Sequence, residues 1–232
     1  MFSAEHFQQA AAQIEPLLQL IGFMPKTVLD LACGPGRHSL PLAQRGCDVT
    51  AVDRSLFLLK KLSAEIQAID FKDASLNVIE GDMRDYSQPG AFDLIVSMWT
   101  SFGYFDAEQD NLDVLSRCYE NLNEGGVLVI DTVGKEYLLR ELQPVHCREY
   151  DDGRLLIERP VLDEDMSRIH IEWLLIEGEQ LKRTSFSHSI YTGVELIDRL
   201  LDAGFSQVDL YGDWDAADYD IDAERLIAIA RK

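Results

Sequence analysis

Two kinds of hydrophobic pattern alternate along the first 131 residues and return near the end of the chain. Short, almost wholly apolar runs predict strands at 27–31, 47–52, 76–80, 92–98, 126–131, 207–211 and 225–230. Between them, apolar residues recur every three or four positions, which predicts helices at 4–21, 37–44, 55–69, 107–122 and 193–203. Ser55 and Asp106 are the expected caps of the third and fourth helices.

Strands that alternate with helices pair in parallel through right-handed crossovers. Runs such as Val127 to Ile130 lack polar alternation, which is typical of strands buried on both faces. The sequence therefore predicts an α/β fold, a doubly wound Rossmann-like sheet of seven mostly parallel strands.

The pattern changes between residues 145 and 190. Extended segments at 154–162, 167–176 and 180–190 follow one another, separated by the acidic turn 163–165 and by Gly178. In the second segment Ile169, Ile171 and Trp173 alternate with more polar positions, among them His170, which should be exposed. We expect an antiparallel β meander inserted at 145–190 into one domain, 1–232, where it forms part of the substrate pocket.

Charge and composition narrow the classes of partner. The formal net charge of −20 disfavours nucleic acid and anionic membranes, and it either serves solubility or attracts a cationic substrate such as an amine. The apolar runs are too short to span a membrane, and the first residues lack a basic cluster typical of a secretory signal. The four cysteines have no metal-binding spacing, so we expect reduced thiols, no metal and a cytoplasmic protein.

The stretch KTVLDLACGPGRHSL, residues 26–40, places Gly34 and Gly36 behind a predicted strand. Such a loop can serve a nicotinamide dinucleotide, a nucleotide phosphate, S-adenosylmethionine or only a tight turn. No G-K-[ST] follows, which excludes a Walker loop, and Ser39 replaces the third glycine of a dinucleotide fingerprint.

Acidic residues near the ends of three strands discriminate better than the glycines. Asp30 suits a cationic ammonium group and is poorly placed for a pyrophosphate. Asp53 can accept both ribose hydroxyls, while Asp82 can accept from an adenine amino group that Met83 covers. An amino acid, a ribose and an adenine without phosphate together describe S-adenosylmethionine.

Five motifs in order, LDLACGPGRHS, VTAVDRS, GDMRDY, FDLIVSMWTSFGYF and LNEGGVLVIDT, closely resemble class I S-adenosylmethionine-dependent methyltransferases, of the small-molecule type with an antiparallel insertion after the fifth strand. The resemblance implies a binding site for each part of the cofactor. The methionine part would contact Asp30, Ala32, Cys33, Gly34 and Gly36, and the ribose would contact Asp53, with Arg54 and Leu58 nearby. The adenine would contact Asp82 and Met83, and the transferable methyl group would face Met98 and Trp99. Ala32 stands where many members have glycine, a replacement that is harmless if φ at this position is negative.

We expect methyl transfer to nitrogen or oxygen of a small metabolite by in-line displacement. Trp99, with other aromatic residues of 99–105, can form a wall beside the sulfonium, and His188 and Tyr191 can reach the substrate from the insertion. Cys33 is expected to be a packed residue, and His38 a solvated one. The alternatives are a non-catalytic adenosyl-binding regulatory module and a nicotinamide oxidoreductase, and the sequence leaves the oligomeric state open.

Overall fold

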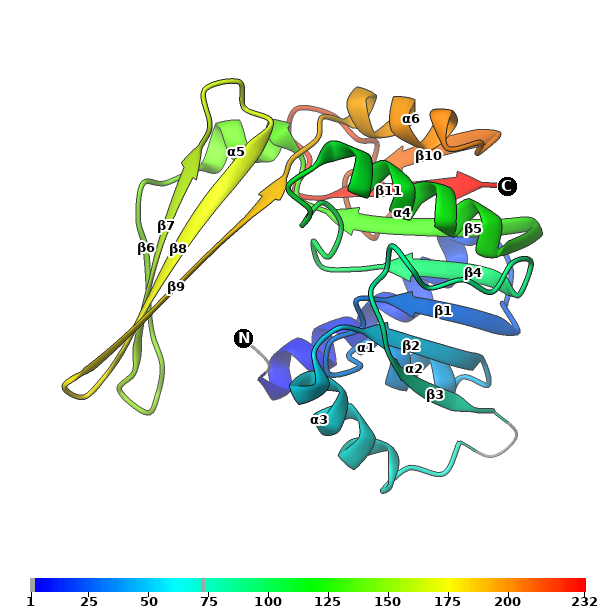
Figure 1. Cartoon of the computed structure of the whole chain (residues 1–232), viewed down its shortest axis with the longest axis horizontal. Coiled ribbons are helices and arrows are strands. Elements are labelled where there is room, and N and C mark those ends of the chain that lie inside the picture. Colours follow the sequence, from blue (N-terminus) through cyan, green and yellow to red (C-terminus); the bar gives the residue numbers. More distant parts are fainter. Residues whose placement is uncertain (1–2, 72–73) are drawn as a thin grey trace.

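The computed structural model describes residues 3–71 and 74–232 of the chain. In these residues the main sheet has seven strands in the order β10-β11-β5-β4-β1-β2-β3 (Figure 1). β11 is antiparallel to both neighbours and the other pairs are parallel, which confirms the predicted sheet. The strands are β1 Thr27–Leu31, β2 Asp48–Asp53, β3 Leu76–Glu80, β4 Phe92–Ser97, β5 Leu122–Thr132, β10 Gln207–Tyr211 and β11 Leu226–Arg231.

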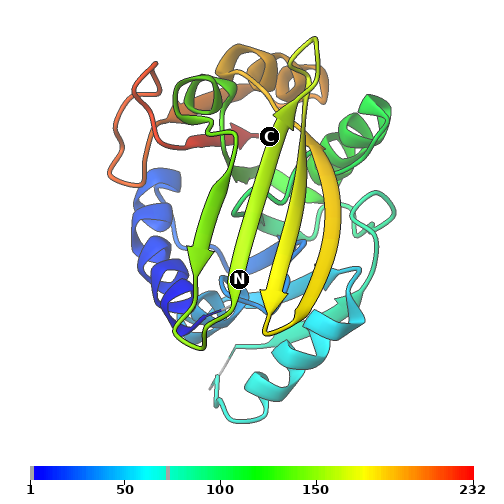
Figure 2. The ribbon, with the colours of Figure 1, turned by 90° about the vertical axis from the view of Figure 1, so that its left-hand side faces the viewer.

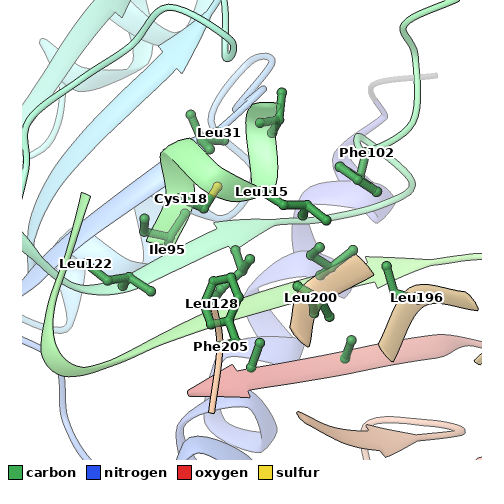
Figure 3. Packing of buried hydrophobic residues seen from close by; sticks show 14 of the residues in the cluster. Leu31, Ile95, Phe102, Leu115, Cys118, Leu122, Leu128, Leu196, Leu200 and Phe205 are labelled. Atoms are coloured by element: carbon green, nitrogen blue, oxygen red, sulfur yellow. The ribbon is translucent and has the colours of Figure 1, made fainter. Parts of the chain in front are cut away.

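Each central strand buries both of its faces. In β5, Leu128 and Ile130 join the core formed with α4 (Glu108–Asn121) and α6 (Gly193–Asp202), part of which is drawn in Figure 3. Val127 and Val129 of the same strand face the opposite core, against α1 (Ala4–Ile21) and α2 (Ser39–Gln44). This two-sided burial explains why the strands read as continuous apolar runs.

The predicted meander forms a separate four-stranded antiparallel sheet in the order β6-β7-β8-β9. Its strands are β6 His146–Glu149, β7 Leu155–Leu162, β8 Arg168–Glu177 and β9 Gln180–Ser189. The arrowheads of β4 and β5 point toward it in Figure 1, and Figure 2 shows it spread in front of the main sheet. The meander therefore stands over the carboxyl ends of the parallel strands, where open α/β sheets bind ligands.

One glycine lets the meander approach the main domain closely. The amide of Ser189 donates to the carbonyl of Gly103 at 2.7 Å. Gly103 has φ +98°, and a Cβ there would lie 2.8 Å from the Ser189 carbonyl oxygen. A side chain at position 103 would push the end of β9 away from the loop that follows β4.

Several details differ from the sequence predictions. The N-cap of α4 is Ala107, without a side-chain bond, and Asp106 instead pairs with Arg168 at 3.3 Å, so the predicted cap was wrong. Ser55 does cap α3 (Leu56–Ile66), accepting from the Leu58 amide. A helix that we did not predict, α5 (Lys135–Glu141), joins β5 to the meander. His170 is exposed, as expected.

Candidate functional site

A cavity of about 700 Å³ is lined by both sheets. The main domain contributes the loops after β1, β2, β3 and β4 and the first turn of α1, and the meander contributes β6, β7 and β8. Among the residues predicted for the site, those in its wall are Ala32, Cys33, Gly34, Asp53, Arg54, Leu58, Asp82, Met83 and Trp99. The switch in strand order between β1 and β4 thus opens into one space, as expected for this fold.

The loop after β1 depends on left-handed backbone. Ala32, Gly34 and Gly36 have φ values of +56°, +57° and +83°. The condition under which alanine would be harmless at position 32, a negative φ, is not met, so an L-residue occupies a position that favours glycine. At Gly36 an added Cβ would lie 2.3 Å from a methyl carbon of the buried Leu62, whereas at Gly34 the nearest atom would be 3.9 Å away. Gly36 therefore packs behind the loop, and Gly34 leaves open space at the cavity.

Asp53 organises that loop. Its carboxylate accepts the Gly34 amide at 2.8 Å and the Ser55 amide at 2.7 Å, and the side chain reaches the cavity at the end of β2. The two bonds fix the carboxylate against the glycine loop and the start of α3. An oxygen that already accepts one amide keeps a lone pair for a ligand hydroxyl.

Asp30 lies beneath the cavity rather than in its wall. It is 2% exposed and accepts the Ser39 hydroxyl at 2.5 Å. Burial raises the pKa of Asp30 to about 7, against the opposing effect of the Ser39 bond. A cationic group in the loop above would favour the ionised form.

Cys33 and His38 are both packed groups. Burial raises the pKa of the Cys33 thiol, and Asp30 and Asp53 raise it further, so the nucleophilic thiolate is suppressed. His38 is 4% exposed with Nε2 2.9 Å from Oε1 of Gln13, and burial lowers its pKa to about 3. The expectation that His38 is solvated was wrong, because α1 covers it.

Asp82 and Met83 follow β3 in the cavity wall. Asp82 accepts from the backbone and the guanidinium of Arg84, with an ion-pair distance of 2.8 Å, and these bonds lower its pKa. Arg84 also contacts Asp110 at 3.1 Å. The carboxylate predicted to meet an adenine amino group is therefore already held by its own turn.

The loop after β4 carries strain. Trp99 and Thr100 have φ +56° and +57°, and neither is glycine. The buried Asp131 at the end of β5 holds both, since its carboxylate accepts the Trp99 amide at 3.1 Å and its carbonyl accepts the Thr100 amide at 2.9 Å. Arg225 donates to the same carboxylate at 2.7 Å. The clamp presents the Trp99 ring to the cavity.

Three side chains hold the Trp99 ring. Its indole N–H donates to Oε1 of Gln13 at 3.0 Å, the Arg37 guanidinium lies 4.0 Å from its centre, and His6 meets it edge-on at 5.4 Å. Met98, in contrast, is 4% exposed and packs in the core shared with α1. The side chains of Trp99 and Met98 thus separate, and only the former lines the cavity.

His188 and Tyr191, which we predicted to reach the substrate, do not line the cavity. The buried His188 uses Nδ1 on the Ser189 carbonyl at 3.0 Å and lies behind the ring of Tyr104. Tyr191 stacks on Phe102 and donates to Glu108 at 3.1 Å. Because the chain turns into α6 here, these side chains enter the core.

Other residues in the wall were missed by the sequence reasoning. Among them are His6 and Arg37 beside the main sheet and His146, Arg148, Glu158 and Trp173 of the meander. Trp173 lay on the predicted apolar face of its strand, which was the one available signal. The others could be found only once the meander was placed over the loops.

The part of the chain that the structure describes contains no cluster of three or more His, Cys, Asp or Glu side chains suited to a metal ion. Within those residues, no helix combines the length and the apolar character needed to cross a membrane.

The chain is similar to known methyltransferases over most of its length. The methyltransferase domain family matches residues 28–126, from β1 into β5. The glycine/sarcosine N-methyltransferase of Aphanothece halophytica is 26% identical over 211 residues, covering 89% of this chain and 76% of that protein.

Two solved structures share the fold over nearly the whole chain. An S-adenosylmethionine-dependent methyltransferase from Clostridium acetobutylicum ATCC 824 is 18% identical, with a TM-score of 0.78 over 97% of this chain and 91% of that one. The sugar N-methyltransferase KedS8 from Streptoalloteichus sp ATCC 53650 is 19% identical, with a TM-score of 0.74 over 97% and 87%.

The chemistry of the cavity fits the cofactor of this family. Asp53 and Asp82 line the cavity, and Asp30 lies beneath it. Gly34 leaves open space at the cavity, and no phosphate-binding lysine follows the glycine loop. Residues 28–126 thus form a methyltransferase domain, and the fold, the ordered motifs and the cavity are those of a class I S-adenosylmethionine-dependent methyltransferase.

Proposed function

We propose that this enzyme methylates the nitrogen of a small amine. The observation that carries the proposal is the wall opposite the cofactor loops, where the half-buried Glu158 faces the cavity beside the ring of Trp173. A carboxylate next to an aromatic ring suits a cationic amine. The relative from Aphanothece halophytica and KedS8 are both named as N-methyltransferases, which supports nitrogen as the acceptor atom.

The proposed cofactor site follows from the residues already placed. Gly34, Asp53, Leu58, Asp82 and Met83 would hold S-adenosylmethionine along the strand ends. When bound, this cofactor supplies a methyl group already activated on a sulfonium. Trp99 would flank the reacting end, and Asp30 would counter the ammonium charge from below. Met98 and Gly36 would support the cavity wall from behind without lining it.

The chain then has to orient the acceptor and exclude water. We assign the first task to the meander and the second to both sheets together. In this proposal residues 1–232 act as a single domain, with 145–190 as the insertion that completes the pocket.

The acid–base groups of the wall favour an amine over a hydroxyl acceptor. A cationic amine has to lose one proton before its nitrogen attacks the methyl group, and the carboxylate of Glu158 beside it can receive that proton and pass it to solvent. A hydroxyl group has a far higher pKa and would need a stronger base as it reacts. The imidazole of His6 is not arranged as a base, because Ser3 donates to its Nδ1 from the backbone amide at 3.3 Å. The remaining nitrogen of the neutral ring is therefore an N–H donor.

The test is release of S-adenosylhomocysteine from the purified protein with matched acceptors. Glycine, sarcosine, methylamine and glucosamine present amines, and glycolate and glucose present the corresponding hydroxyl compounds. We expect turnover with at least one amine and none with the hydroxyl partners. Turnover of a hydroxyl compound alone, or of none of the six while S-adenosylmethionine binds, would contradict the proposal.

A further inference from the structure

We propose that Glu158 and Arg148 select an acceptor that carries an amino group and an anionic group together, as a zwitterionic amino acid does. This inference rests on the proposed transfer to an amine. It assigns the amino end of the acceptor to Glu158 and Trp173, and the anionic end to Arg148 and His6.

The strand register places the two charges close together on one face. In the β6–β7 pair His146 lies opposite Glu158, and Arg148 lies opposite Leu156. Glu158 and Arg148 are therefore diagonal neighbours, a spacing of about 7–8 Å in an antiparallel pair. Both line the cavity, and so does Leu156 between them.

Neither charge has a protein partner. Within residues 3–71 and 74–232, neither Glu158 nor Arg148 forms a side-chain hydrogen bond or an ion pair. The outer face of the same sheet is different, because Glu172 pairs there with Arg159 at 3.5 Å and with Arg183 at 3.2 Å. Glu172 on the outer face is therefore paired, whereas the two opposite charges that line the cavity are not.

The amino end is defined by the residue across from Glu158. Trp173 faces it in the β7–β8 register, and its ring packs edge-on against Phe186 at 5.0 Å. This packing fixes the ring beside the carboxylate. Its indole Nε1 is buried without a hydrogen-bond partner in the described part of the chain, so the edge of the ring that carries this nitrogen is turned away from the open space of the cavity.

The anionic end is defined by positive charge around His6. Burial lowers the pKa of His6, and the nearby charges of Arg37 and Arg148 lower it further. The ring is therefore neutral near pH 7 and, with Nδ1 engaged by Ser3, carries its proton on Nε2. An anion at this corner would meet one guanidinium and one N–H donor.

A single-charge acceptor would leave half of this arrangement unused. An amino sugar without an acidic group would place no anion near Arg148. A carboxylate compound without an amine would leave Glu158 unpaired. Glu158 is half-buried and Arg148 is exposed, so an acceptor that covers either charge without pairing it removes the hydration of that charge, and the wall discriminates against both.

The test compares glycine, glycinamide, methylamine and glucosamine on the same protein. For the wild type we expect kcat/KM to fall about 10-fold or more from glycine to glycinamide and methylamine, as for loss of one charged contact. R148Q should lower kcat/KM for glycine about 10-fold, leave glycinamide unchanged and leave the Kd of S-adenosylmethionine within about 2-fold. E158Q should lower kcat/KM for all four amines.

The matched control is R159Q, which removes an arginine from the outer face of the neighbouring strand and should change none of these values. Calorimetric titration of glycine onto the protein saturated with S-adenosylhomocysteine gives a readout independent of turnover, and R148Q should weaken that binding by a similar factor.

The outcomes separate the two proposals. If no amine is methylated, the proposed function fails. If glycinamide, methylamine or glucosamine is methylated as well as glycine or better, the function stands and the selection by Arg148 is wrong. If R148Q raises the Kd of S-adenosylmethionine and leaves glycine unaffected, Arg148 serves the cofactor carboxylate, which also overturns the inference.

Discussion

The two walls of the cavity treat their charged groups in opposite ways. On the strand-end side, Asp53 and Asp82 line the cavity, yet each already accepts hydrogen bonds from its own chain. On the meander side, Glu158 and Arg148 have no such partners in the described residues. The first wall is organised before any ligand arrives, whereas we propose that the second is completed by the acceptor.

This difference suits two tasks with different demands. A cofactor of constant shape is best met by fixed backbone and anchored carboxylates, which reduce the ordering that binding requires. An acceptor is selected by side chains, which can change without disturbing the strands that carry them. If the comparison is sound, changes on the strand-end wall affect stability and cofactor affinity, and changes on the meander wall affect the choice of acceptor.

The largest effect is expected from G36A. The new methyl group would collide with Leu62, and the φ of +83° would be strained. We expect a loss of about 2–4 kcal/mol in the free energy of unfolding, measured with urea. G46A is the control, because Gly46 has φ +96° but open space around it, and should lose only about 1 kcal/mol. Equal losses would show that packing behind the loop is unimportant.

A second test uses the pH dependence of stability. The pKa of Asp30 is about 7 in the folded protein and 3.8 for the ordinary group, so the native state keeps a proton that the unfolded chain has lost. This group therefore weakens the native state as pH rises from about 4 to about 7. D30N has no such proton, and relative to wild type it should gain about 2 kcal/mol between pH 5 and pH 8 in urea unfolding. A pH-independent difference would contradict the burial argument.

D53N should affect the cofactor more than the fold. Asp53 keeps one amide bond as asparagine but loses the charge and an acceptor beside the ribose position. The Kd of S-adenosylmethionine should rise about 10-fold by calorimetry. D48N serves as control, since Asp48 begins the same strand and binds Ser75 far from the cavity. Unchanged affinity in D53N would refute the cofactor placement.

The smallest effect is expected from A32G. Relief of the left-handed φ of +56° should raise the free energy of unfolding by about 1 kcal/mol. A216G, at φ +66° outside the cavity, should gain as much while leaving the Kd of S-adenosylmethionine unchanged. If both variants also bind the cofactor like wild type, the strain at Ala32 has no part in binding.

The sequence predicted the frame well because its central strands bury both faces and its edge strands are short apolar runs. β1, β3 and β10 have the predicted boundaries, and the acids at strand ends fall near one cavity because parallel strands end at one edge. Helix α5 was missed because none of its seven residues is buried, so no apolar stripe marks it.

The meander wall was harder to predict from the sequence for a geometric reason. Glu158 and Arg148 become neighbours only through the register of β6 with β7, and they meet the cavity only through the placement of the meander. His188 and Tyr191 misled us because proximity in sequence to the insertion does not fix the direction of a side chain. Both enter the core where β9 gives way to α6.

The side-chain oxygen of Gln13, Oε1, has a consequence for the rate at which ligands exchange. This single atom on α1 meets Nε2 of His38 behind the loop and the indole N–H of Trp99 in the wall. If α1 moves away from the sheet, the hydrogen bond between Gln13 and Trp99 breaks and His6 leaves the cavity wall in the same step. Amide hydrogen exchange in α1 should therefore slow when S-adenosylmethionine binds, and the residence time of the cofactor would be set partly by the undocking rate of the first helix.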